Sequence, residues 1–348
     1  MAFLIYVLFE FMDTIFSSFL TYIYLPSKSY GLFSASYYGY LITLFNALGF
    51  VLLWLSLYRF SALNYSFYLL VLFILSLSMS FISLPSIVLF LLFLFLVFHT
   101  AFFFWYEVLA TKFEKFEIIV GLSYAAGFLA LGMLLFLEKL SLSLLALLYS
   151  AFLISMLLFR NIKIPARKLD FSQIKSPRFI AEILSVWLMG EYAEVLSSMA
   201  YYVLKDSASL SEPYIHRLFA TALISAFFSA LLSPILLEKL GIKYLGVLTV
   251  LLMLSIPPFV GFSRLFYPLS VLVGISIALY WIFFRTYLYY RYPKDEYIYR
   301  FMFFYFSSHL GGVFLYSLIF QILQNHQLSL FIFSLLLIPA LFINLLLF

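Results

Sequence analysis

The sequence predicts an all-α polytopic membrane protein, and three observations support this fold class. Of the 348 residues, 66% are hydrophobic and only 10% are charged, whereas about a quarter of the residues of a soluble globular protein are charged. Apolar runs of about 20 residues, the length of a helix that spans a bilayer, recur along the chain between short polar breaks. The runs do not alternate between apolar and polar residues, which excludes a transmembrane barrel.

Breaks at Pro, Gly, Ser and charged residues divide the chain into twelve predicted spans. Their approximate bounds are 3–24, 36–57, 64–83, 86–109, 116–137, 141–159, 180–204, 214–236, 244–262, 267–290, 299–322 and 328–347. The first span has no Lys or Arg before Lys28 and contains two acids, so we interpret it as a mature helix and not as a signal peptide.

One long polar stretch, residues 160–178, separates six predicted spans from the next six. We therefore expect an N-terminal six-helix bundle at 1–160, a basic cytoplasmic linker at 161–178 and a C-terminal six-helix bundle at 179–348.

The basic residues are distributed unequally between the two sides of this topology. A cytoplasmic N-terminus places fourteen of them inside: Arg59, Lys112, Lys115, Arg160, Lys163, Arg167, Lys168, Lys175, Arg178, Lys239, Lys243, Arg291, Lys294 and Arg300. Five lie outside: Lys28, Lys139, Lys205, Arg217 and Arg264. By the positive-inside rule, we expect a multi-pass protein of the cell membrane with both termini in the cytoplasm. The net charge of +5 then reflects topology and contact with anionic lipids, and no nucleic-acid partner is expected.

Residue types that carry enzyme or cofactor chemistry are sparse. The chain has no cysteine, and its four histidines form no metal-binding spacing. The longest polar loop contains a single acid, Asp170, and no histidine. We therefore expect no metal, no cofactor and no enzymatic activity.

Acidic residues inside two spans form an internal repeat. Three polar residues recur 181 positions later (191−10, 194−13 and 198−17): Glu10 as Glu191, Asp13 as Glu194, and Ser17 as Ser198. An ionised carboxylate at the centre of a span costs roughly 2.5–3.5 kcal/mol. Because positions i, i+3 and i+7 share one face of a helix, each copy forms a polar stripe that must face protein or water.

Further features recur at nearly the same offset. Tyr58-Arg59 corresponds to Glu238-Lys239, and Lys115 with Gly127 corresponds to Arg300 with Gly312. Residues 238–243, Glu-Lys-Leu-Gly-Ile-Lys, are similar to a loop motif of one transporter family. The motif reads acid, base, any residue, Gly, any residue, base, and it follows the second and the eighth helix of that family. Of the first copy of this motif, only Arg59 is kept.

With twelve spans, a basic central loop and this motif, the sequence resembles the major facilitator superfamily of secondary transporters. The resemblance implies two parallel-repeat bundles around a central cavity, lined by the first, fourth, seventh and tenth helices. We expect Glu10 to superpose on Glu191 and Asp13 on Glu194 about an axis along the membrane normal. The charged residues and histidine inside these four spans are Glu10, Asp13, His99, Glu107, Glu191, Glu194 and Arg285. His309, in the eleventh span, is the exception.

The acids of this set are candidates for proton coupling. Burial and neighbouring like charges disfavour ionisation, so such carboxylates bind protons readily. We assign coupling to Asp13 and Glu194, with Glu10 and Glu191 in the same cavity. The alternative is that these acids pair with Arg285, His99 or backbone groups and only hold the halves together.

The remaining candidates have weaker signals. Arg285 is a counter-ion or an anchor for an oxyanion, or it snorkels to the cytoplasmic surface. For Glu107, snorkelling or anchoring of a loop is the favoured interpretation over a counter-ion role. His99 is a proton relay or a simply hydrogen-bonded histidine. Trp105 and Trp281 could stack on a cyclic or cationic substrate.

The sequence therefore predicts a proton-coupled secondary active transporter that works by alternating access. Four acids and one Arg in the cavity favour a small cationic or zwitterionic organic solute. We expect a monomer whose partners are this solute, a proton or sodium ion, and membrane lipids. The alternatives are a membrane-embedded enzyme, a lipid-linked-sugar flippase and a membrane scaffold without transport activity.

The predicted topology can be tested by labelling. A single cysteine introduced into the linker at 161–178 should react with a membrane-impermeant thiol reagent in inside-out vesicles but not in intact cells. The natural absence of cysteine makes the background low. Labelling of intact cells would reverse the assignment of the inner and outer sides.

Overall fold

The computed structural model describes residues 2–58, 64–82, 84–107, 114–137, 141–156, 176–307 and 311–347. Within these ranges the regular elements are helices, and the only β feature is an isolated bridge between Tyr30 and Phe33. The all-α prediction is confirmed for the described residues.

The helices of the first half begin with α1 and pass through a π-helix, η1. Their bounds are α1 Ala2–Ser18, η1 Phe19–Tyr24, α2 Leu25–Ser29, α3 Ala35–Tyr58, α4 Tyr65–Phe81, α5 Pro85–Glu107, α6 Phe116–Phe136 and α7 Leu142–Met156. The helices of the second half are α8 Pro177–Ser198, α9 Ala200–Ala208, α10 Glu212–Leu254, η5 Pro257–Phe259, η6 Ser263–Leu265, α11 Phe266–Arg291, α12 Lys294–Ser307, α13 Gly312–Leu323, α14 His326–Ser334 and α15 Leu337–Leu347.

Six of the described helical segments are long and apolar enough to cross a membrane. They are Ala35–Ser56, Pro85–Phe103, Phe116–Phe136, Glu212–Phe259, Phe266–Arg291 and His326–Leu346. Three further apolar helices are shorter, at Tyr65–Phe81, Leu142–Met156 and Gly312–Leu323. These findings support a multi-pass membrane protein, while the count of twelve spans stays a prediction.

Two predicted spans, 214–236 and 244–262, fall largely within α10, which consists of two helical parts joined at a kink. Its backbone is broken at Gly241, where φ is 74° and ψ is 166°. A positive φ of this kind favours glycine, which has no Cβ to clash with the backbone. The glycine of the loop motif therefore lies at the break that the sequence predicts between these two spans.

The first predicted span, 3–24, is also not a single regular helix. It runs as an α-helix to Ser18 and as a π-helix from Phe19 to Tyr24. Short π-helical turns are rare and frequently occur at functional sites.

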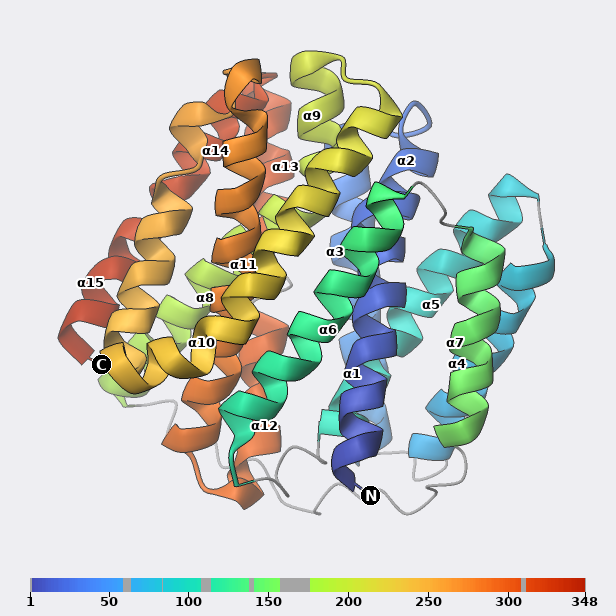
Figure 1. The fold of residues 1–348 in the computed structure, drawn as a ribbon, viewed down its shortest axis with the longest axis horizontal. Helices are drawn as coiled ribbons and strands as arrows, with labels where there is room; N and C mark the ends of the chain where they lie inside the picture. The colour runs from blue at the N-terminus through green and yellow to red at the C-terminus, as the bar shows by residue number, and fades with distance from the viewer. Residues whose placement is uncertain are drawn as a thin grey trace.

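Helices of the two halves pack against each other most extensively along two lines of contact. The second half contacts the first through α10 against α6 and through α13 against α3. Figure 1 shows α6 and α10 crossing the middle of the molecule, with α1, α4, α5 and α7 on one side and α8, α11 and α15 on the other.

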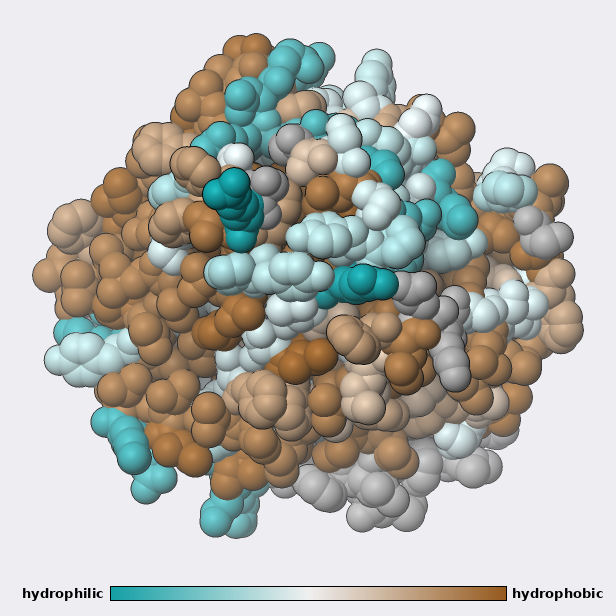
Figure 2. Space-filling view, turned by 45° about the horizontal axis from the view of Figure 1, so that its top comes forward, coloured by the Kyte–Doolittle hydropathy of each residue, from teal (hydrophilic) through white to brown (hydrophobic). Residues whose placement is uncertain are grey.

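The outer surface of the helices is apolar. Large hydrophobic side chains are exposed along most helices, including Phe81, Phe136, Phe228, Ile322 and Phe342. Figure 2 shows apolar residues over most of the visible sides, whereas hydrophilic residues gather on the end that is turned toward the viewer. Such a distribution suits a protein surrounded by lipid, since a soluble monomer rarely exposes large contiguous apolar patches.

Candidate functional site

A central cavity lies between the two halves and is lined by polar and aromatic side chains. The volume of the cavity, counted as the space open to the centres of water molecules, is about 120 Å³. Its lining comprises Glu10, Asp13, Thr14, Ser17, Ser18, Thr21, Tyr22, Ile42, Asn46, Leu96, His99, Thr100, Phe103, Tyr124, Phe128, Glu194, Ile277, Trp281 and Tyr305. The first, fourth, seventh and tenth predicted spans all contribute, through α1 with η1, α5, α8 and α11. Residues of α3, α6 and α12 complete the lining.

Asp13 lies on the first-half side of this cavity and is held by side chains from α1, α5 and α7. Its Oδ1 lies 2.6 Å from His99 Nε2 of α5 and accepts a hydrogen bond of 3.0 Å from the Tyr149 hydroxyl of α7. Ser17, one turn along α1, donates to Oδ2 at 3.3 Å. The carboxylate is buried but remains in the cavity wall.

Glu194 is the acid that the second half contributes to the same wall. It lies on α8, is 6% exposed, and accepts a hydrogen bond of 2.7 Å from Ser198. Trp281 of α11 and Tyr305 of α12 also line the cavity. The cavity therefore contains one acid of the repeated pair from each half.

A buried ionic cluster forms around Arg285, a residue of α11 with no exposed surface. Its guanidinium donates to the carboxylates of Glu10 on α1 and Glu107 on α5. Tyrosine hydroxyls complete the cluster: Tyr6 and Tyr124 accept hydrogen bonds from Arg285, and Tyr297 donates to Glu107 at 2.5 Å. The guanidinium also lies over the Tyr124 ring, 5.3 Å from its centroid.

The Arg285 cluster adjoins the central cavity at the end nearer the N-terminus, because Glu10 and Tyr124 belong to both. The α1 and η1 residues of the cavity wall run from Glu10 to Tyr22, whereas Tyr6 lies one turn closer to the N-terminus and in the cluster. Arg285 and Glu107 are absent from the cavity lining. Because Arg285 belongs to the second half and its partner acids to the first, the cluster joins the two halves.

Snorkelling is therefore wrong for both Glu107 and Arg285, while anchoring of a loop by Glu107 stays a prediction because residues 108–113 lie outside the described residues. Both side chains are 0% exposed and face each other inside the protein. An ion buried in protein is tolerated only where hydrogen bonds satisfy its remaining donors and lone pairs. Here tyrosine hydroxyls and carboxylates supply partners for the two terminal guanidinium nitrogens, and Tyr297 donates to Glu107, whereas Arg285 Nε is buried without a hydrogen-bond partner among the described residues.

Glu191 differs from the other three repeated acids. Its carboxylate accepts the backbone N–H groups of Gly311, at 2.9 Å, and Gly312, at the start of α13. A Cβ on Gly312 would clash with the carboxylate, so only glycine permits this approach. Glu191 is not part of the cavity lining, and its carboxylate lies at the positive end of the α13 dipole.

A second polar network joins the two halves at the end of the molecule that carries α2, α9 and α14 (Figure 1). The Tyr30 hydroxyl donates to Asp206 Oδ1 at 2.6 Å, and His326 Nε2 lies 3.0 Å from Asp206 Oδ2. Burial alone would raise the pKa of Asp206, but the hydrogen bonds from His326 and Tyr30 outweigh it and hold that pKa below 3.8. The hydrogen bond to Asp206 raises the pKa of Tyr30 to about 12.

The other predicted residues are either outside the part of the chain that the structure describes or absent from the cavity lining. The side chain of Trp105, residue His309 and the loop residues 157–175 lie outside the described residues. Glu238, Lys239, Gly241 and Lys243 lie at the bend of α10, away from the cavity lining.

The sequence interpretation missed the tyrosines that hold the buried charges. Tyr6 precedes Glu10 by one helical turn, so helical spacing could have identified it. Tyr124, Tyr149 and Tyr297 carry no such local signal among the 28 tyrosines of the chain.

Comparison of the sequence with models of protein families and with curated proteins finds no match. Among solved structures, the fold is similar to that of the nucleoside transporter NupG, solved as a point mutant, with a TM-score of 0.70 and 13% sequence identity. The similarity covers 100% of this chain and 100% of that one. The chain therefore has a fold similar to that of NupG.

Replacing Arg285 with Met should destabilise the protein by about 3–5 kcal/mol, because two buried carboxylates lose their common partner. The matched control is Arg291→Met on the same helix. Arg291 is 41% exposed and Glu182 has other partners, so the change should cost less than about 1 kcal/mol. Unfolding in detergent measures both. Adding Glu10→Gln and Glu107→Gln should restore much of the loss. Equal stability of the two single variants would contradict the buried cluster.

The Asp206 network should stabilise the fold above the pKa of Asp206 and lose this contribution in acid. Because the folded-state pKa is depressed, the contribution is fully present above 3.8 and disappears as the pH falls through the folded value. The difference in unfolding temperature between the wild type and Asp206→Asn should therefore be present at neutral pH and shrink below 3.8. A difference that is the same at neutral and acidic pH would mean that packing, not charge, explains it.

Proposed function

We propose that this chain is a secondary active transporter of a small organic solute, with a preference for cations or zwitterions and with proton coupling. The observation that carries the proposal is the pair of acids in one cavity wall, Asp13 from the first half and Glu194 from the second. A site built from both halves can change its access when the halves move relative to each other.

The charges of the cavity support the preference for a positive solute. Its lining contains three acids, Glu10, Asp13 and Glu194, and no Lys or Arg among the described residues. Glu10 is compensated by Arg285. Asp13 and Glu194 face the cavity, where a proton, the charge on His99 or a positive solute can compensate them. An uncompensated charge at this depth is costly, so each carboxylate should exchange one positive partner for another during a transport cycle.

The predicted division into two bundles, 1–160 and 179–348 with a linker between them, is part of this proposal. Corresponding pairs of helices support the parallel repeat. In the first half α1 contacts α6, α3 contacts α5, and α4 contacts α7. In the second half α8 contacts α13, α10 contacts α11, and α10 contacts α15. These pairs match if α10 counts as the eighth and ninth spans, separated at Gly241.

Two polar networks bridge the halves and suit alternating access. The Arg285 cluster joins them at the end of the cavity nearer the N-terminus, and the Tyr30–Asp206 hydrogen bond joins them at the opposite end. A rocking motion of the halves would open one network while the other stays closed. We place the Arg285 cluster on the cytoplasmic side, with both termini, in a monomer in the cell membrane.

Substitution of the two cavity acids, Asp13 and Glu194, gives the decisive test. Asp13→Asn and Glu194→Gln should each leave the protein folded while abolishing solute accumulation driven by a pH gradient in reconstituted vesicles. Exchange of solute without a gradient should persist with reduced affinity, because the other acid of the pair Asp13 and Glu194 remains in the cavity. Glu212→Gln is the matched control, since Glu212 is half exposed and outside the cavity.

The contrary outcomes separate the alternatives. Full accumulation by both variants would show that these acids are structural. Accumulation that follows an imposed sodium gradient at constant pH would replace the proton by sodium as the coupling ion. Absence of uptake by the wild type for cations, zwitterions and nucleosides alike would favour an enzyme, a flippase or a scaffold.

A further inference from the structure

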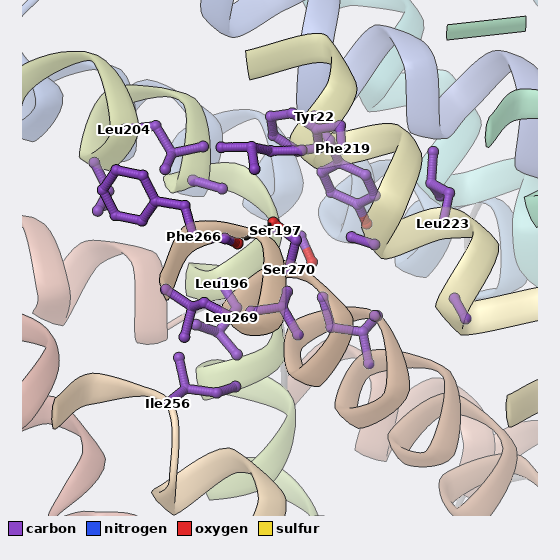
Figure 3. A pocket seen from close by; sticks show the side chains of 18 of the residues that line it. Tyr22, Leu196, Ser197, Leu204, Phe219, Leu223, Ile256, Phe266, Leu269 and Ser270 are labelled. Atoms are coloured by element: carbon purple, nitrogen blue, oxygen red, sulfur yellow. Dashed lines mark hydrogen bonds between the residues drawn. The ribbon is translucent and has the colours of Figure 1, made fainter. Parts of the chain in front are cut away.

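A second cavity, which we call the apolar chamber, adjoins the central cavity in the second half of the molecule. Its volume, counted in the same way as that of the central cavity, is about 130 Å³. It lies between α8 with α9, α10 and α11, and Leu330 of α14 also contributes. Figure 3 shows Leu204, Phe219, Phe266, Leu269 and Ile256 around this space.

The apolar chamber has almost no hydrogen-bonding capacity. Its lining is dominated by Leu, Val, Ile, Phe and Ala side chains. The Ser197 and Ser270 hydroxyls, labelled in Figure 3, donate to backbone carbonyls of their own helices, at 2.8 Å each. A polar group entering the chamber would therefore lose its water without gaining partners, which is unfavourable.

The chamber and the central cavity share part of their walls. Ser18, Tyr22, Phe128 and Ile277 line both spaces. Asp13 and Glu194 line only the central cavity. The residue after Glu194, Val195, belongs to the wall of the chamber. A ligand group held at the acids thus lies next to an apolar space of similar volume.

We propose that the solute is an amphipathic organic cation. Its positive group binds at Asp13 and Glu194, and its apolar arm occupies the chamber. This inference rests on the proposed function and names the substrate class of the same site. Binding pockets commonly combine an apolar lining with a few polar groups that fix orientation, and here the two parts are segregated into adjacent spaces.

A matched set of probes tests this segregation with the full chain in lipid nanodiscs. Tetramethylammonium carries the charge alone, benzyltrimethylammonium adds an apolar arm, and benzyl alcohol carries the arm without the charge. Burial of the aromatic arm should make benzyltrimethylammonium bind about 10-fold tighter than tetramethylammonium, or more. Benzyl alcohol should compete weakly, since it lacks a partner for the acids.

Two variants fill the chamber without touching the acids. Ser270→Phe and Val273→Phe should each abolish the advantage of the benzyl arm and leave the affinity for tetramethylammonium unchanged, which also shows that the variants are folded. Val271→Phe is the control, because it places the same side chain on the same helix outside the chamber lining. It should keep the advantage.

The results separate this inference from the proposed function. If the benzyl advantage is absent in the wild type or survives both filled variants, the chamber does not hold the arm and the inference fails. Equal competition by benzyl alcohol would assign the chamber to lipid chains and would also overturn it. Tighter binding of adenosine than of either cation would replace the substrate class. The expected binding pattern without gradient-driven uptake would instead refute transport while keeping the ligand class.

Discussion

The structure depends on how negative charge is compensated inside an apolar protein. The acids inside the spans have different partners: Arg285 for Glu10 and Glu107, His99 and Tyr149 for Asp13, Ser198 for Glu194, and the α13 N-terminus for Glu191. Because none of these carboxylates can face lipid, their partners fix which helices meet. The relative placement of α1, α5, α8, α11 and α13 follows in large part from these contacts.

The sequence predicts the helical membrane fold well because composition and the length of apolar runs are direct consequences of the bilayer. Helical spacing also predicts that the repeated acids avoid lipid, and all four are buried. The sequence does not predict that Glu191 leaves the cavity. That depends on α13 beginning at Gly312, inside the predicted span 299–322, which the structure divides between α12 and α13.

The positions of Glu107 and Arg285 within their predicted spans show a second limit of prediction from sequence. Their distance from the ends of their spans is compatible with snorkelling, and single-helix reasoning favours it for Glu107. The tertiary structure reverses this interpretation because α1, α6 and α12 bring tyrosine hydroxyls around the ion pair. The hydrogen bonds of Tyr124 and Tyr297 join residues more than 100 positions apart, so spacing along one helix cannot identify these two partners.

The π-helix η1 changes the angular phase of the first transmembrane segment. An α-helix advances by about 100° per residue, and a π-helical turn contains more residues for each turn of the chain. The side chains beyond Phe19 are therefore rotated relative to the stripe of Glu10, Asp13 and Ser17. Tyr22, within this rotated part, borders both spaces of the site, whereas Asp13 borders only one. Ser18, the last residue of α1, also borders both spaces, so η1 extends this double contact to Tyr22, and tightening η1 into regular α-helix would turn Tyr22 away from its present position between them.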